Sequence, residues 1–257
     1  MATVVRHPDI AISTGAYAHL PLAAALITIS ELASAAEVTS YREHSLLDLD
    51  NARAAAASGL SLSVHGPFFR VDLGSLDERR RQAGVELHRR HLKVAAALGA
   101  TTYLVHPDRQ RKPGPRRPEV VAALQRSLCE LRELQDRSGV AVVVENMPVP
   151  GLSHFVAPGD LDLCGLGVGL DVGHALASGT LDAWLADPRP APRHVHLHDN
   201  HGEPGGDEHL PLGAGTVNVA AVMAAVRAWG VRVVIEHKTP LDVEASIAYL
   251  DAHGLLP

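Results

Sequence analysis

The sequence has few aromatic residues, few cysteines and no excess of positive charge. Aromatic residues make up 4% of the 257 residues, so the core is expected to consist mostly of alanine, valine and leucine. The formal net charge of −6 argues against a surface that coats nucleic acid in general. The two cysteines, Cys129 and Cys164, are isolated in the sequence, which favours a reduced, cytoplasmic protein over a disulfide framework.

Long hydrophobic runs are also absent. The most apolar early stretch, residues 20–29, is too short to span a bilayer and is expected to form part of a core helix. The N-terminus lacks the succession of basic, apolar and small residues that marks a signal peptide. We therefore expect a soluble, cytoplasmic protein that makes no membrane contact.

Short strand-like runs alternate with longer helix-like runs along the whole chain. The expected strands are 9–13, 37–40, 60–65, 101–106, 140–145, 167–172, 193–198 and 231–236. The expected helices lie near 21–34, 48–58, 76–98, 118–138, 178–186, 217–229 and 241–253. This alternation predicts an α/β fold, a (β/α)8 TIM barrel that forms a single domain over residues 1–257. A doubly wound open sheet is disfavoured, because no glycine-rich phosphate-binding motif follows the first strand.

Most of the expected strands end in a side chain that can bind a metal ion. The candidates are His65, His106, Glu145, Asp171, His196 and Glu236 at or near strand ends, and His174, Asp207 and His209 in the segments that follow. The C-terminal ends of barrel strands converge on one face, so these side chains should meet in one active site. That many buried imidazoles and carboxylates would repel one another or lie unpaired without cations between them. The pattern predicts a polynuclear metal centre, with Glu145 or Glu236 as a bridging ligand.

Several local motifs carry a family resemblance. They include His106-Pro107, Glu145-Asn146, the Asp-Val-Gly-His-Ala run that begins at Asp171, and the Asp-Glu-His run that ends at His209. With these motifs the chain resembles the xylose-isomerase-like barrel superfamily, and within it the apurinic endonuclease IV family. The resemblance implies three zinc ions. It assigns His65, His106 and Glu145 to the first ion, Glu145, Asp171, His196 and Glu236 to the second, and His174, Asp207 and His209 to the third.

This metal set implies a phosphoesterase. Two zinc ions about 4 Å apart would present a bridging hydroxide to the phosphorus of a small sugar-phosphate or nucleotide-type substrate. Glu145, Glu236 and His174 are the candidate catalytic residues. DNA is disfavoured as a substrate by the acidic net charge, by the Gly-Pro-Phe-Phe run after His65, and by Ala214, which stands where that family has glutamate between two glycines.

The main alternative is a sugar or sugar-phosphate isomerase or epimerase, because the His-x-Pro-Phe pattern after His65 is typical of such relatives. That resemblance implies one divalent ion, Mn²⁺, Mg²⁺ or Co²⁺, bound by Glu145, Asp171, His196 and Glu236. The two glutamates would transfer a proton, and His174 would contact the substrate. We rank this reading second, because it requires no role for His65, His106, Asp207 or His209. A third class, a barrel that binds a metal or a sugar as a sensor without turnover, has no tail, repeat or partner helix to support it.

Further residues are candidates for substrate contact. Phe68 and Phe69 would wall the pocket, or else cap the barrel as ordinary loop residues. Arg109 opens an arginine-rich segment, residues 109–117, that could bind a phosphate, although a solvated loop is the slightly favoured explanation. His198 is a substrate contact or a donor to a metal ligand, whereas His194 is expected to be a hydrogen-bonded core residue.

Overall fold

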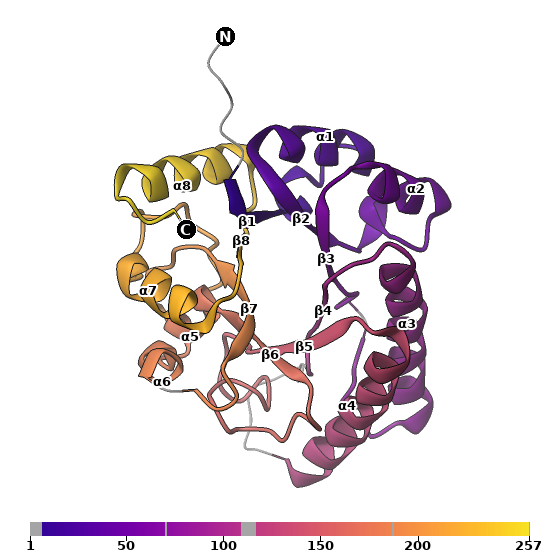
Figure 1. The fold of residues 1–257 in the computed structure, drawn as a ribbon. Helices are drawn as coiled ribbons and strands as arrows, with labels where there is room; N and C mark the ends of the chain where they lie inside the picture. Colours follow the sequence, from indigo (N-terminus) through magenta and orange to yellow (C-terminus); the bar gives the residue numbers. More distant parts are fainter. Residues whose placement is uncertain (1–6, 70, 109–116, 187, 257) are drawn as a thin grey trace.

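Eight parallel strands close into a barrel in the computed structural model, which describes residues 7–69, 71–108, 117–186 and 188–256 (Figure 1). Each strand pairs with the next, and the last pairs with the first. The strands are β1 His7–Ser13, β2 Ala33–Thr39, β3 Ser61–His65, β4 Thr102–Val105, β5 Ala141–Glu145, β6 Gly167–Asp171, β7 Pro192–Leu197 and β8 Val233–Ile235. The predicted TIM barrel is confirmed.

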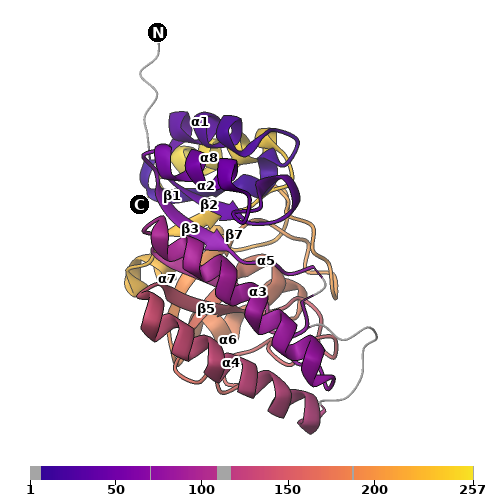
Figure 2. The same cartoon turned by 90° about the vertical axis from the view of Figure 1, so that its right-hand side faces the viewer.

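Helices surround the strands on the outside of the barrel (Figures 1 and 2). They are α1 Leu22–Leu32, α2 Leu49–Ala57, α3 Glu78–Ala97, α4 Pro118–Ser138, α5 Val172–Ala177, α6 Leu181–Ala186, α7 Val219–Trp229 and α8 Pro240–Ala252, with short 3-10 turns at Thr14–Tyr17 and Arg42–His44. Several helices begin at a side-chain cap of the expected type. Asp48, Asp77 and Thr239 each accept a backbone N–H of the first turn.

The structure differs from the sequence prediction in two places that concern the site. Strand β2 begins at Ala33, inside the helix expected near 21–34, so Glu37 lies within the strand and not at its start. The helix expected near 178–186 is α6, Leu181–Ala186, and an additional helix that the sequence did not predict, α5, precedes it. Helix α5 starts directly after β6, because the side chain of Asp171 accepts the backbone N–H of His174 at 2.7 Å and caps the helix.

The main hydrophobic core lies between the strands and the helices. In β3, for example, Leu62 and Val64 belong to this core, whereas Ser63 and His65 alternate with them and face the barrel interior. The core is largely aliphatic, as expected from the composition. Inside the barrel, Ala11, Ala35 and Val234 form a separate small cluster. The other interior positions include apolar residues, such as Leu104 and Val143, and the polar side chains described below.

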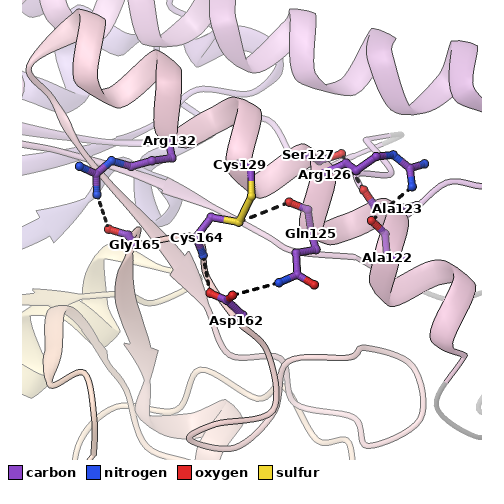
Figure 3. The surroundings of a disulfide bond; sticks show 10 residues. All are labelled: Ala122, Ala123, Gln125, Arg126, Ser127, Cys129, Arg132, Asp162, Cys164 and Gly165. Carbon is purple, nitrogen blue, oxygen red and sulfur yellow. Dashed lines mark hydrogen bonds between the residues drawn. A yellow bond between two sulfur atoms is a disulfide. The ribbon is translucent and has the colours of Figure 1, made fainter.

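The expectation that the two cysteines are reduced and form no disulfide is wrong. Cys129 in α4 and Cys164 in the loop before β6 form a disulfide, with their Cα atoms 5.2 Å apart (Figure 3). Neighbouring contacts hold the same loop against α4. Gln125 donates to Asp162 at 3.1 Å, and Arg132 donates to the carbonyl of Gly165 at 2.8 Å. The pairing spans 35 residues and depends on how this loop packs, so sequence spacing alone did not reveal it.

No helix in the described part of the chain is long and apolar enough to cross a membrane. The disulfide removes the cysteine-based argument for a reduced compartment. A cytoplasmic location therefore stays a prediction.

Candidate metal centre

The nine predicted metal ligands lie at the carboxyl ends of the strands or in the segments that follow them. His65, Glu145 and Asp171 are the last residues of β3, β5 and β6. His106 and Glu236 directly follow β4 and β8. Because neighbouring parallel strands end at the same level of the barrel, their side chains converge on the axis.

Four of these residues form the largest group of possible metal ligands among the described residues, which is the predicted second set: Glu145, Asp171, His196 and Glu236. Their ligand atoms all lie within 4.8 Å of one another. Nδ1 of His196 is 2.9 Å from Oε1 of Glu145 and 2.8 Å from Oε2 of Glu236. The same nitrogen is 3.7 Å from Oδ2 of Asp171. Ligand atoms about 2.1 Å from one ion are separated by about 3.0 to 3.4 Å, so these spacings fit a shared divalent ion.

Hydrogen bonds among these four side chains do not explain why they converge, because two of their buried atoms have no hydrogen-bond partner in the described part of the chain. Nδ1 of His196 and Oε2 of Glu145 are buried and have no hydrogen-bond partner within the described ranges. Both nevertheless lie close to atoms of opposite polarity, such as Nε2 of His106 at 2.7 Å from Oε2 of Glu145. A divalent cation among them would satisfy both orphaned atoms, so the residues present fit a metal ion.

A residue that the sequence reading missed completes this centre. Glu37 of β2 is fully buried, and its Oε1 is 2.8 Å from Nε2 of His196. Because the carboxylate accepts the Nε2–H, the neutral imidazole keeps its lone pair on Nδ1, the nitrogen that faces the other ligands. Burial raises the pKa of Glu37, but the adjacent His196 and His194 outweigh it and leave that pKa well below its usual range.

The second oxygen of Glu37 is also fully used. Oε2 accepts Nε2–H of His194 at 2.6 Å and the hydroxyl of Ser63 at 3.1 Å. His194 is therefore buried and hydrogen-bonded, as expected from the sequence. One signal could have identified Glu37: it is the only charged residue in β2, and it alternates in register with Ala35, which faces the interior.

His65 and His106 lie on the other side of Glu145, and together with it they form the predicted first set of ligands. Their Nε2 atoms are 3.2 Å apart, and Nε2 of His65 is 3.7 Å from Oε2 of Glu145. Burial lowers the pKa of His65, and the neighbouring His106 lowers it further. Neutral imidazole is the form that ligates metals, so this pair can bind a cation together with Glu145.

The predicted third set is brought together only in part. Oδ1 of Asp207 is 2.8 Å from Nε2 of His209 and 3.4 Å from Nε2 of His174. The ligand atoms that lie within 4.8 Å of one another are those of His198, Asp207 and His209, without His174. Burial lowers the pKa of His174, but Asp171 and Asp207 overcome it and raise the pKa to about 10. Asp207 likewise outweighs burial at His209 and raises its pKa to about 9.

His198 supports a candidate ligand. Its Nε2 is 3.1 Å from Oδ1 of Asp171, and its ring stacks on His209 with centroids 4.1 Å apart. Gly173 packs against the ring so closely that a Cβ at this position would collide with it. His198 thus lies where a donor to a metal ligand is expected.

Aromatic side chains form a wall beside the His65–His106 pair. The ring centroid of Phe68 is 5.3 Å from that of His65 and 5.2 Å from that of His106. Tyr41, which the sequence reading did not select, contacts the rings of both Phe68 and Phe69. Phe68 and Phe69 are 37% and 55% exposed, so they can contact a bound molecule. Arg109 lies outside the described residues.

Comparison with known proteins gives the following matches. A family described as "Xylose isomerase-like TIM barrel" matches residues 32–253. An uncharacterized protein of Methanocaldococcus jannaschii is 29% identical over 178 residues, which are 65% of this chain and 66% of that protein. The chain thus spans just under two thirds of the length of this curated relative.

Two solved structures resemble the whole barrel. A D-tagatose 3-epimerase-like protein superposes with a TM-score of 0.81 at 24% identity, covering 95% of this chain and 96% of that one. A protein from Thermus thermophilus, solved after soaking with ZnCl2, has a TM-score of 0.65 at 30% identity. That match covers 96% of this chain and 97% of the Thermus chain.

Proposed function

Because the chain belongs to the xylose isomerase-like TIM barrel family, we propose that it is a divalent-metal-dependent isomerase or epimerase of a sugar or sugar-like molecule. We also propose that residues 1–257 form one domain. The observation that carries the function is the convergence of Glu145, Asp171, His196 and Glu236, with Nδ1 of His196 buried and unpaired in the described part of the chain. The resemblance to a D-tagatose 3-epimerase-like protein supports the same chemistry. This reverses the ranking from the sequence, which placed the phosphoesterase first.

The two glutamates are suited to proton transfer. Oε1 of Glu145 and Oε2 of Glu236 face the shared centre, so both carboxylates lie beside the place where the metal would hold a substrate. They come from β5 and from the end of β8, which are not adjacent in the barrel, and so they approach the axis from different sides. The side chain of Glu236 is 15% exposed and that of Glu145 is 2% exposed, so Glu236 is the better placed to reach a substrate.

A bound divalent ion supplies polarisation of a substrate carbonyl, which acidifies the adjacent carbon. One glutamate then removes the proton from that carbon, and the other returns a proton from the opposite side. His174 is buried with its Nε2 3.4 Å from Oδ1 of Asp207, and it would contact the substrate. Phe68 packs against His65, and together with the more exposed Phe69 it would limit the access of water to this side of the site.

The test is isotope exchange. Protein loaded with Mn²⁺, Co²⁺, Mg²⁺ or Zn²⁺ is incubated in D2O with ketopentoses and ketohexoses, free and phosphorylated. NMR should detect deuterium at the carbon beside the carbonyl, together with an epimer or isomer. Glu236→Gln should slow this exchange by at least about 100-fold. Glu31→Gln, in the exposed part of α1, is the matched control. The proposal fails if no sugar of the panel exchanges with any of the four metals.

Phosphoester hydrolysis is a second candidate for one reason. His65 and His106 converge on Oε2 of Glu145, and a mononuclear isomerase does not require this second set of ligands. Elemental analysis of zinc-loaded protein separates the two functions, because a trinuclear site predicts close to three ions per chain. One ion per chain, together with no hydrolysis of phosphodiesters or phosphomonoesters, excludes this candidate.

A further inference from the structure

A second cavity opens at the opposite end of the barrel, around the amino ends of the strands. Its volume is about 620 Å³, within the range of about 300 to 1,000 Å³ that is typical of small-molecule sites. None of the nine candidate metal ligands lines it. The space exists because inward positions of β1 and β2 are Ala11 and Ala35, where such barrels usually carry bulky branched residues.

The wall of this cavity is basic although the chain as a whole is acidic. Arg193, Arg227 and Arg232 line it, and no carboxylate does. Nη1 of Arg232 donates to Oγ of Ser61 at 3.1 Å. Since Arg232 precedes β8 and Ser61 opens β3, three strand steps away, this guanidinium reaches across the mouth. Within the described ranges, the side chain of Arg193 has no hydrogen-bond or ion-pair partner.

The deeper part of the cavity is also polar. Ser63 and Thr102 contribute hydroxyl groups, and His194, which is 5% exposed, contributes its ring. Nε2 of His194 is bonded to Glu37, whose other oxygen bonds His196. Two hydrogen-bonded side chains, those of His194 and Glu37, therefore connect this cavity with the candidate metal ligand His196.

We propose that the amino-end cavity binds a small phosphate-bearing molecule. The guanidinium groups of Arg193 and Arg232 hold the phosphate at the mouth, because the planar fork of arginine matches phosphate oxygens. The hydroxyls of Ser63 and Thr102 hold the polar remainder of the molecule. An occupant that contacts His194 also acts on the Glu37–His196 pair, so binding at this end is coupled to metal affinity at the other.

Calorimetric titration of the metal-loaded protein with glycerol 3-phosphate, inorganic phosphate and glycerol, at constant ionic strength, tests the site. Glycerol 3-phosphate should bind one per chain, inorganic phosphate more weakly, and glycerol not measurably. The double variant Arg193→Gln, Arg232→Gln should weaken binding at least tenfold. Both side chains are exposed, so folding should be preserved. Arg53→Gln, which removes an exposed arginine of α2, is the control and should leave the affinity unchanged.

Two results would overturn this assignment. One is the absence of saturable binding of either phosphate up to millimolar concentrations. The other is an affinity that the double arginine variant leaves unchanged, which would place the phosphate at the metal centre instead. Because the readout is binding and not turnover, failure of the isomerase proposal leaves the assignment of this cavity intact.

Discussion

Glu37→Gln alters one buried group at the centre of the barrel and is expected to weaken metal binding. The carboxylate accepts N–H groups from His194 at 2.6 Å and from His196 at 2.8 Å. Glutamine keeps the shape but has only one acceptor oxygen, so its NH2 group must face one of the two imidazoles. If it faces His196, that ring must carry its proton on Nδ1, where the proton displaces the cation.

The expected magnitude follows from the role of such partners. Loss of the group that orients a metal-binding histidine lowers metal affinity by about 10- to 100-fold, or about 1.4 to 2.7 kcal/mol. His194→Gln should cost less, because Glu37 keeps its own bond to His196 in that variant. If Glu37 orients His196, Glu37→Gln should lower metal affinity more than His194→Gln does. A general disturbance of the barrel interior would not produce this order.

Metal affinity is measured by competition with a fluorescent zinc chelator, and circular dichroism checks that each variant is folded. Glu31→Gln is the matched control, since it removes a carboxylate from the exposed part of α1. A folded Glu37→Gln protein that binds zinc within twofold of the unsubstituted protein would refute the reasoning. In that case His196 needs no partner to present Nδ1 to the metal.

Three further predictions concern other parts of the molecule. Burial lowers the pKa of His88 to about 3, against about 6.5 in an unfolded chain. The unfolded state therefore binds the proton first, so stability should fall as the pH drops from about 6.5 to about 3, by up to about 5 kcal/mol. Urea unfolding at pH 7 and pH 4 should show a smaller loss for His88→Gln, and an equal loss would contradict the argument. Alkylation of the protein without reductant should find no free thiol, and two alkylated cysteines would exclude the disulfide. Cys129 and Cys164 are 35 residues apart, so reduction of their disulfide should lower the free energy of unfolding by up to about 4 kcal/mol. In Gly173→Ala the new Cβ would lie 2.5 Å from Nδ1 of His198, so the ring should leave Asp171 and metal affinity should fall, whereas Gly84→Ala, with its nearest contact at 3.3 Å, should bind metal normally.

The residues at the carboxyl ends of the strands could be predicted from the sequence because strand periodicity and barrel geometry both determine their positions. Strand periodicity placed Glu145 and Asp171 at the ends of β5 and β6, as the structure has them. Barrel geometry then brings such ends to one face, whatever the loops do. The same logic brought His65 and His106 together. It did not resolve the position of His174 relative to Asp207 and His209, because the segment after β7 follows its own turns.

The sequence analysis did not predict the role of Glu37 or the disulfide, and the physical reason is the same for both. Each depends on a contact between two segments that are far apart in the sequence, and no local sequence pattern indicates that these segments meet. Glu37 bonds His194, 157 residues away, and lies inside the barrel instead of at its end. Cys129 meets Cys164 only because the loop before β6 packs on α4. Local periodicity predicts which face a side chain occupies, but it does not identify the partner across the fold.

Stability and function depend on different faces of the strands: the outer face packs against the helices, and the inner face carries the polar side chains of the candidate site. Val144 belongs to the core between strands and helices, while the adjacent Glu145 faces the axis. Truncation of an outward residue such as Val144 leaves a cavity in that core and should lower stability by a few kcal/mol with metal affinity preserved. Inward changes such as Glu37→Gln remove little apolar packing, so they should alter metal affinity. Since His194, Glu37 and His196 form a hydrogen-bonded chain inside the barrel, these side chains can link the cavity at the amino ends with the candidate metal centre without passing through the core between strands and helices.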